Sequence, residues 1–302
     1  MTAESTYDAL IIGGSTAGLS AALTLGRSLR RVLVLDGGQP CNWQTPHSHN
    51  FFTRDGATPQ HLLALGCEQL RAYPTVSVLQ ATVVRAASTP AGFHVTTTDG
   101  QTFTGRKVLL ATGVKDQLLP LPGFAECWGI SVLHCPYCHG YEVHGQPLGV
   151  LGNGDQGFEF ARLIQHWSAD LRLFTNGSAT LTAEQMGQLT ARGIRIVEAP
   201  IAAVEHTAGQ LHHLRLADGQ QEPLTALFAH VPATQSTDLA QQLGCALTAQ
   251  QLIQVDDFGA TTAPGVFAAG DNSSPMRQLS IASARGGMAG AFLNRELVLE
   301  DF

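Results

Sequence analysis

Short runs of apolar residues, each followed by glycines and then by a helix-like stretch, recur along this chain. The first is YDALIIGGSTAGLSAALTLGRS, residues 7–28, in which a buried strand leads into a glycine-rich turn and a helix with small residues. The next strand, RVLVLD, ends at Asp36. This order of strand, glycine turn, helix, strand and acid is typical of a dinucleotide-binding βαβ unit.

The first glycine-rich turn has the pattern G-x-G-x-x-G, with a serine at its middle glycine. Free N–H groups at the start of the helix attract a pyrophosphate, although Ser15 slightly crowds the approach. Asp36 follows Gly13 by 23 residues, where an acid binds ribose hydroxyls. The candidate binding residues of this unit are Gly13, Gly14, Ser15, Ala17, Gly18 and Asp36.

A second copy of the pattern, PLGVLGNGDQGFEFARLIQHW, spans residues 147–167 and keeps all three glycines, Gly152, Gly154 and Gly157. Two copies in one chain indicate two dinucleotide-type folds. After the next strand, LRLFTNG, no Lys or Arg occurs from Leu173 to Ala191, and Arg172 lies within the strand. The 2′-phosphate of NADPH therefore lacks its usual arginines, and the ribose of NADH lacks an acid. NADH, NADPH, a second FAD and a purely structural turn remain open here.

Strand patterns continue between and after these units. FHVTTTDGQTFTGRKVLLATGV predicts a hairpin turning at Asp99-Gly100 and a buried strand ending at Ala111-Thr112-Gly113. The prolines of LLPLPGF, residues 118–124, indicate a domain linker. The chain closes with a strand, Gly270-Asp271, a loop, and a helix rich in Ala and Gly from about Leu279. We therefore expect an α/β protein with two Rossmann-like FAD/NAD(P)-binding domains.

Composition narrows the class of partner. A length of 302 residues favours two domains, and no apolar run approaches the roughly 18 residues that would span a membrane. The net charge of −7, with two lysines, argues against nucleic acid. The acidic N-terminal segment lacks the basic and apolar regions of a signal peptide, so we expect a cytoplasmic protein.

The motif HCPYCHG, residues 134–140, carries the candidate chemistry. Cys135 and Cys138 could form half of a zinc site with Cys127 and His144, a static disulfide, or a redox pair. No second C-x-x-C supports zinc, and in a reducing compartment this spacing is more often redox-active or metal-bound than structural. Pro136 favours a helix start, which would lower the pKa of a thiol there.

The histidines that flank the motif, His134 and His139, would lower the thiol pKa further if they were protonated.

The other cysteines carry less information. Cys67 and Cys245 lie on apolar faces of predicted helices and are expected in the core. Cys41, His47 and His49 superficially resemble metal ligands, but a fourth ligand is missing, and we interpret the stretch as a loop near a cofactor. No metal site is predicted.

Five segments resemble the low-molecular-weight thioredoxin reductases in their order and spacing, which cover nearly the whole chain. These segments are IIGGSTAG, LLATG, HCPYCHGYE, GNGDQG and GVFAAGDNSSPMRQLSIASARGG. The chain also resembles a branch in which His-Gly follows the second cysteine, and which includes dithiol oxidases acting on gliotoxin and holomycin. The resemblance implies a homodimer, with a FAD domain at 1–118 and 246–302 and a nicotinamide-type domain inserted at 119–245.

The resemblance also implies roles for particular residues. Cys138 would be the sulfur nearer the flavin, and Cys135 would exchange with the external disulfide. His139 replaces the family's acid, and we hypothesise that it moves the proton. Besides the first turn and Asp36, the implied FAD contacts are Asn50, Thr112, Gly113, Gly270, Asp271, Arg277 and Gln278.

Three functions follow from these expectations. The leading hypothesis is a FAD-dependent disulfide oxidoreductase that passes electrons from flavin through Cys135 and Cys138 to a thioredoxin-like protein or small disulfide. Its electron donor would be ferredoxin, NADH or a second flavin rather than ordinary NADPH. In the runner-up, a small dithiol reduces the cysteine pair and oxygen accepts the electrons. The third is a flavin redox sensor without turnover.

Overall fold

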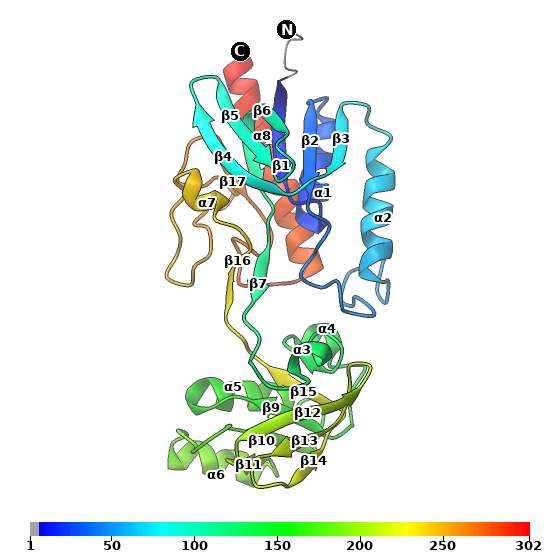
Figure 1. Cartoon of the computed structure of the whole chain (residues 1–302), viewed down its shortest axis with the longest axis vertical. Helices are drawn as coiled ribbons and strands as arrows, with labels where there is room; N and C mark the ends of the chain where they lie inside the picture. Colours follow the sequence, from blue (N-terminus) through cyan, green and yellow to red (C-terminus); the bar gives the residue numbers. More distant parts are fainter. Residues whose placement is uncertain (1–5) are drawn as a thin grey trace. The chain divides into compact units, whose positions relative to one another are not determined.

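The computed structural model describes residues 6–302, which form two compact units (Figure 1). Unit 1 contains the described residues through Trp43 together with Asn50–Lys115 and Ala233–Phe302. Unit 2 contains Gln44–His49 and Asp116–Pro232. The chain returns to unit 1 at Ala233, before the expected boundary at 246, and it also visits unit 2 briefly at residues 44–49.

Unit 1 is built on a seven-stranded sheet with the order β3-β2-β1-β6-β5-β4, on which β17 also pairs with β6. β1, β2, β3, β6 and β17 pair in parallel, whereas β4 and β5 join as an antiparallel extension. The predicted turn at Asp99-Gly100 is confirmed between β5 and β6. The strands are β1 (Tyr7–Ile12), β2 (Val32–Asp36), β3 (Val76–Gln80), β4 (Val83–Thr89), β5 (Gly92–Thr97), β6 (Thr102–Leu110) and β17 (Val266–Ala268).

Two long helices, α1 and α8, cover one face of this sheet and pack closely against each other. A Cβ at Gly286 would lie 2.1 Å from the carbonyl oxygen of Ala17, and one at Gly290 would lie 2.9 Å from that of Ala21. Glycines in α8 therefore let the two backbones approach. The helices of unit 1 are α1 (Thr16–Arg27), α2 (Pro59–Leu70), α7 (Leu239–Gln242) and α8 (Leu279–Asp301).

A charge cluster fastens the end of α8 to β6. Lys107, only 7% exposed, lies 2.9 Å from Glu296 and 2.5 Å from Glu300. Its neighbour Arg106 pairs with Glu300 at 2.9 Å and with Asp301 at 2.7 Å. The last helix of the chain is thus held to a strand formed by residues 102–110.

Unit 2 has a five-stranded parallel sheet with the order β11-β10-β9-β15-β8 and a separate antiparallel sheet, β12-β13-β14. Its strands are β8 (Val132–Leu133), β9 (Leu148–Leu151), β10 (Leu171–Phe174), β11 (Arg195–Val197), β12 (Ile201–Thr207), β13 (Gln210–Leu216), β14 (Gln221–Pro223) and β15 (Ala226–Ala229). Its helices are α3 (Phe124–Cys127), α4 (Pro136–His139), α5 (Gly154–Ile164) and α6 (Ala183–Ala191).

The segment LLPLPGF is not a linker, contrary to the prediction. Leu118, Leu119 and Leu121 pack against the core of unit 2 that contains Phe124, because three leucines gain more from burial than from a solvent-exposed connection. The chain leaves unit 1 at β7 (Val114–Asp116) and returns to it at β16 (Ala233–Gln235). These two short strands pair with each other.

The α/β class with two Rossmann-like units is confirmed. No helix in residues 6–302 has both the length and the apolarity needed to cross a bilayer.

Candidate active site

The first glycine-rich turn joins β1 to α1 in a tightly packed backbone. Gly13 has φ +111°, and a Cβ there would lie 2.2 Å from the carbonyl oxygen of Ala111. A Cβ at Gly18 would lie 1.9 Å from the carbonyl oxygen of Gly13. Ser15 precedes α1 without a side-chain cap, and the first turn of α1 holds no acid. The N–H groups of this turn are therefore suited to an anionic pyrophosphate.

Asp36 lies at this turn, as predicted from its place at the end of β2. Its Oδ1 accepts a hydrogen bond from the backbone N–H of Gly14 at 3.1 Å. A Cβ at Gly14 would lie 2.6 Å from that of Asp36, so glycine is needed where the acid approaches the turn.

A residue that was not predicted from the sequence, Asn272, links the ends of β6 and β17. Asn272 is fully buried, and its Nδ2 donates to the carbonyl oxygen of Leu110 at 2.9 Å and to Oγ1 of Thr112 at 3.2 Å. These bonds bring the predicted residues Thr112 and Asp271 to one sheet edge. Gly113 and Gly270 turn the backbone there with φ +65° and +95°. The only sequence signal for Asn272 was its position directly after the predicted aspartate.

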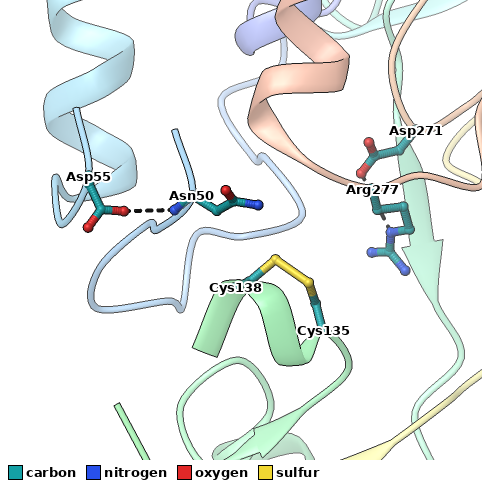
Figure 2. The surroundings of a disulfide bond; sticks show 6 residues. All are labelled: Asn50, Asp55, Cys135, Cys138, Asp271 and Arg277. Carbon is teal, nitrogen blue, oxygen red and sulfur yellow. Dashed lines mark hydrogen bonds and ion pairs between the residues drawn. A yellow bond between two sulfur atoms is a disulfide. The ribbon is translucent and has the colours of Figure 1, made fainter. Parts of the chain in front are cut away.

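Asp271 is the centre of a small polar group (Figure 2). Its Oδ2 lies 3.5 Å from Nε of Arg277 and accepts from Sγ of Cys41 at 3.6 Å. Gln278 precedes α8 without a side-chain cap, and the first turn of α8 contains no acid. The structure thus brings Asp271 and Arg277 together, and the start of α8 supplies a second set of N–H groups for an anion.

Asn50 adopts a left-handed conformation, φ +59°, and its N–H donates to Oδ1 of Asp55 at 2.8 Å (Figure 2). This bond orders the loop that carries Asn50. The bond uses the backbone N–H of Asn50, so the Asn50 side chain takes no part in it.

Cys135 and Cys138 form a disulfide in unit 2, with Cα atoms 5.3 Å apart (Figure 2). Cys135 precedes the one-turn helix α4, which starts at Pro136 as the sequence predicts. Aromatic packing supports this turn: Tyr137 meets Trp167 edge-on at 5.7 Å, and a Cβ at Gly140 would lie 2.6 Å from Nε1 of Trp167.

His139 is held neutral at pH 7. Burial, and to a smaller extent the charge of His49, lower the pKa of His139 from 6.5 to about 4. The condition under which His139 would lower the thiol pKa, a protonated ring, is therefore not met near neutral pH, because a buried imidazolium is poorly solvated. A neutral imidazole can instead accept a proton from a thiol.

His134 packs on an aromatic side chain. Its ring stacks on that of Trp128 at 5.9 Å between centroids, and Trp128 donates from Nε1 to Oδ2 of Asp116 at 3.1 Å. Asp116 and Trp128 thereby fix the residue that precedes Cys135.

The zinc interpretation finds no geometric support in residues 6–302, where no three His, Cys, Asp or Glu side chains gather as a metal site. Cys127 is buried in the core of unit 2, and burial raises the pKa of its thiol. His144 stacks on Tyr141 at 5.0 Å. Cys245 is buried in the core as expected, whereas Cys67 is only partly buried and packs at the edge of the core.

The second glycine-rich turn, between β9 and α5, has the predicted backbone. A Cβ at Gly157 would lie 2.6 Å from the carbonyl carbon of Gly152, so the third glycine permits close packing of helix on strand. Gly154 has φ +55°, and a Cβ there would lie 3.0 Å from Oγ1 of Thr180. A chain segment that follows β10 therefore lies directly against this turn.

Asn153 ties that segment to the turn. Its Oδ1 accepts from the backbone N–H of Gly154 at 2.9 Å and from that of Thr180 at 2.7 Å. Its Nδ2 donates to the carbonyl oxygens of Ser178 at 2.9 Å and Thr175 at 3.4 Å. One backbone N–H of the second turn, that of Gly154, is thus already bonded to an amide oxygen of the chain.

Arg172, the arginine within β10, is engaged with residues other than the turn. It pairs with Asp170 at 3.3 Å and with Glu222 at 3.4 Å, and donates to the carbonyl oxygen of Pro223.

One Rossmann-like unit has a cradle for an anionic dinucleotide, and the other carries a C-x-x-C disulfide. The family described as "Pyridine nucleotide-disulphide oxidoreductase" matches this chain over residues 7–286. The chain belongs to this family. It is therefore a FAD-dependent disulfide oxidoreductase, and its relatives make it a divergent thioredoxin reductase-like member. It is 33% identical to "Thioredoxin reductase tcpT" of Claviceps purpurea, covering 99% of this chain and 97% of the relative.

Two solved structures have the same fold. An oxidoreductase from Agrobacterium tumefaciens is 35% identical with a TM-score of 0.92, covering 98% of this chain and 99% of that one. HlmI is 34% identical with a TM-score of 0.93, covering 100% of this chain and 95% of that one.

The residues of unit 1 fit the FAD that this family uses. The glycine cradle and the acid-free starts of α1 and α8 suit the pyrophosphate and an electron-rich flavin edge. Asp36 and Asp271 can accept hydrogen bonds from ribose and ribitol hydroxyls. In unit 2 the N–H of Gly154 is bonded to Asn153, and the first turn of α5 contains an acid, Asp155.

Proposed function

We propose that this chain oxidises a small dithiol to a disulfide, with electrons entering at Cys135–Cys138 and oxygen as the final acceptor. FAD would be held in unit 1 by the first turn, Asp36, Asn50, Thr112, Gly113, Asp271, Arg277 and Gln278. The balance is one dithiol and one O₂ consumed for one disulfide and one H₂O₂ formed.

The observation that carries this proposal is the closed second turn. Asn153 saturates the N–H of Gly154 and holds the segment at Thr180 against the glycines. A pyrophosphate bound to the N–H of Gly154 would have to displace Asn153, and it would meet an acid, Asp155, in the first turn of α5. If no nicotinamide cofactor enters there, electrons come from a thiol or from an electron-transfer protein.

The charge of unit 2 points in the same direction. It contains eleven Asp and Glu residues against five Arg and no Lys, a formal net charge of −6. Four of these arginines, at 162, 172, 195 and 215, already pair with acids of the unit. The negative electrostatic field of unit 2 disfavours the binding of NADPH, which carries three negatively charged phosphates, and of an acidic electron-transfer protein.

Exposed aromatic rings beside the disulfide favour an apolar substrate. Tyr137 is 58% exposed and Tyr141 is 75% exposed, and both are held by ring contacts with Trp167 and His144. Such rigid rings give an apolar molecule a large contact area.

The reaction begins with thiol–disulfide exchange. A thiol of the substrate loses its proton to His139, and the thiolate attacks Sγ of Cys135, releasing Cys138 as a thiolate. The second substrate thiol then attacks the mixed disulfide, which forms the product disulfide and leaves Cys135 reduced. When bound, FAD supplies the two-electron acceptor that restores Cys135–Cys138 and the site at which oxygen is reduced.

Reduction of a thioredoxin-like protein is the second candidate, favoured by the name of the Claviceps purpurea relative. An anaerobic titration separates the two. The FAD-loaded protein is mixed in turn with NADPH, NADH, reduced ferredoxin and dithiothreitol, and flavin absorbance is followed, with a Cys135→Ser, Cys138→Ser double variant as the control.

We expect bleaching by dithiothreitol alone, absent in the double variant, and peroxide on admission of air. Rapid bleaching by NADPH, NADH or ferredoxin would instead establish the reductase. Bleaching by none of the four would leave the redox sensor and overturn the oxidase.

A further inference from the structure

Asn272 is held by hydrogen bonds from three other segments of unit 1. Its carbonyl oxygen accepts from the backbone N–H of Ile253 at 2.8 Å and from Nε2 of Gln235 at 2.9 Å. Its side chain reaches the end of β6, where Nδ2 donates to the carbonyl oxygen of Leu110 and to Oγ1 of Thr112. The position of this amide is therefore fixed through both its backbone and its side chain.

The side-chain amide of Asn272 is only half used by the fold. The residue is fully buried, and its Oδ1 accepts no hydrogen bond from any group in residues 6–302. A buried acceptor without a donor lowers stability. The carbonyl of Leu110 does not depend on Asn272, because it also accepts from the backbone N–H of Ala269 at 3.0 Å. A leucine of similar branched shape would thus serve folding at least as well, so stability alone does not explain an asparagine at 272.

The bond from Asn272 determines what the hydroxyl of Thr112 can do. A threonine hydroxyl donates one hydrogen bond, and Oγ1 already accepts one from Nδ2 at 3.2 Å. The amide nitrogen cannot accept in return, so the proton of the Thr112 hydroxyl is directed away from Asn272. Within residues 6–302 this hydroxyl donates to no other group. It is therefore available to donate to a ligand.

We propose that Asn272 is a positioning residue for FAD, which orients the Thr112 hydroxyl as a hydrogen-bond donor to the bound cofactor. FAD carries acceptors for such a donor on its flavin ring, its hydroxyls and its pyrophosphate. The inference deepens the proposed function and rests on it for the place of Thr112 beside FAD. Asn272 itself need not touch the cofactor, because its effect passes through the hydroxyl of Thr112.

A double-mutant cycle tests this role through the affinity for FAD. Asn272→Leu and Thr112→Val remove the donor and the hydroxyl with little change of shape, and a third protein carries both changes. Thr97→Val is the control, because Thr97 is a buried threonine of unit 1 whose hydroxyl donates to Asp99 at the turn between β5 and β6. Each holoprotein is diluted, and the fluorescence of released flavin gives the dissociation constant. Thermal unfolding is followed in excess FAD.

We expect Asn272→Leu and Thr112→Val each to weaken FAD binding about fivefold, the effect of one hydrogen bond. The double variant should bind FAD only as weakly as Thr112→Val alone, because the two residues act through one bond. Asn272→Leu should lose no more thermal stability than its weaker FAD binding accounts for. Thr97→Val should unfold at a lower temperature and keep the wild-type dissociation constant.

Additive losses in the double variant would overturn the inference, because Asn272 would then act independently of Thr112. Unchanged FAD affinity in Asn272→Leu together with a lower unfolding temperature would also overturn it, since the residue would serve the fold alone. If Asn272→Leu does not fold, Asn272→Ala gives the same comparison, because it removes the same donor without adding bulk beside Leu110.

This outcome is separable from that of the proposed function. FAD affinity is measured without a dithiol, oxygen or a nicotinamide cofactor. If NADPH proves to be the electron donor while the double variant stays non-additive, the oxidase fails and the role of Asn272 stands. If instead Thr112→Val leaves FAD affinity unchanged, Thr112 does not contact FAD and the inference fails, whereas the direction of electron flow is unaffected.

Discussion

Oδ1 of Asn153 accepts a hydrogen bond at 2.7 Å from the backbone N–H of Thr180, 27 residues further along the chain. Glycine at this position would leave both that N–H and the N–H of Gly154 to other acceptors. One amide side chain thus ties the second glycine-rich turn to the segment that follows β10.

Asn153→Gly should loosen the segment that follows β10. Each of the two lost hydrogen bonds to a backbone N–H contributes about 1 kcal/mol to the stability of this segment. We expect amide hydrogen exchange at Thr180 to accelerate about tenfold, as measured by mass spectrometry or NMR. Asn153→Asp keeps the acceptor oxygen and should keep most of the protection, so equal exchange in wild type and Asn153→Gly would contradict the closed turn.

Cys135→Ser should change the colour of the FAD-loaded protein. Without its partner, Cys138 is a free thiol. In the role that the family resemblance implies, Cys138 is the sulfur nearer the flavin, and its thiolate would give a long-wavelength charge-transfer absorption that grows as the thiol ionises. Absorbance spectra against pH test this. Cys138→Ser serves as the matched variant and should lack the band; a band in Cys138→Ser alone would reverse the assigned roles.

His139 should make the protein less stable in mild acid. The pKa of His139 is lowered from 6.5 to about 4, so the unfolded chain takes up the proton first as the pH falls. Its contribution to stability is complete above pH 6.5, decreases toward pH 4 and then levels off. At pH 5 the loss is about 2 kcal/mol.

Urea unfolding of wild type and His139→Gln at pH 7 and pH 5 measures this difference. The variant should lack this part of the acid sensitivity. Parallel losses in both proteins would mean that His139 is charged in the folded state.

Gly286→Ala and Gly287→Ala form a matched pair in α8. A Cβ at 286 would lie 2.1 Å from the carbonyl oxygen of Ala17, whereas the nearest atom at 287 is Oγ1 of Thr24 at 3.6 Å. We expect Gly286→Ala to lose about 2 kcal/mol or more, and Gly287→Ala to be neutral or slightly more stable.

Thermal unfolding and the ratio of bound FAD to protein follow both changes. Because α1 begins at the first glycine turn, Gly286→Ala should also retain less FAD. Equal behaviour of the two variants would refute the close contact of α1 and α8.

Local patterns predicted those parts of the fold whose partners lie nearby in sequence. The apolar run ending at Asp36 predicted β2 and the meeting of this acid with Gly14, because a βαβ unit usually returns the second strand beside the first. The spacing of Cys135 and Cys138 likewise limited the possible chemistry to a few kinds.

Contacts between distant residues could not be predicted. Nothing in HSHN indicated that Nε2 of His49 would lie 3.4 Å from Oε1 of Glu142, and nothing in GNGD indicated that Asn153 would reach Thr180. The charge state of His139 depends on burial, which a single sequence does not give. LLPLPGF was misassigned because its prolines suggested a linker, whereas its leucines decided the packing.

The fastening of α8 to β6 by Lys107 and Arg106 has a consequence for biosynthesis. On the ribosome, the strands and helices of residues 116–232 emerge complete while the sheet of unit 1 still lacks β17 and the helix that covers it. The proposed flavin contacts Asp271, Arg277 and Gln278 are translated after all of the elements of residues 116–232. We therefore expect FAD to bind only after residues 116–232 have been synthesised.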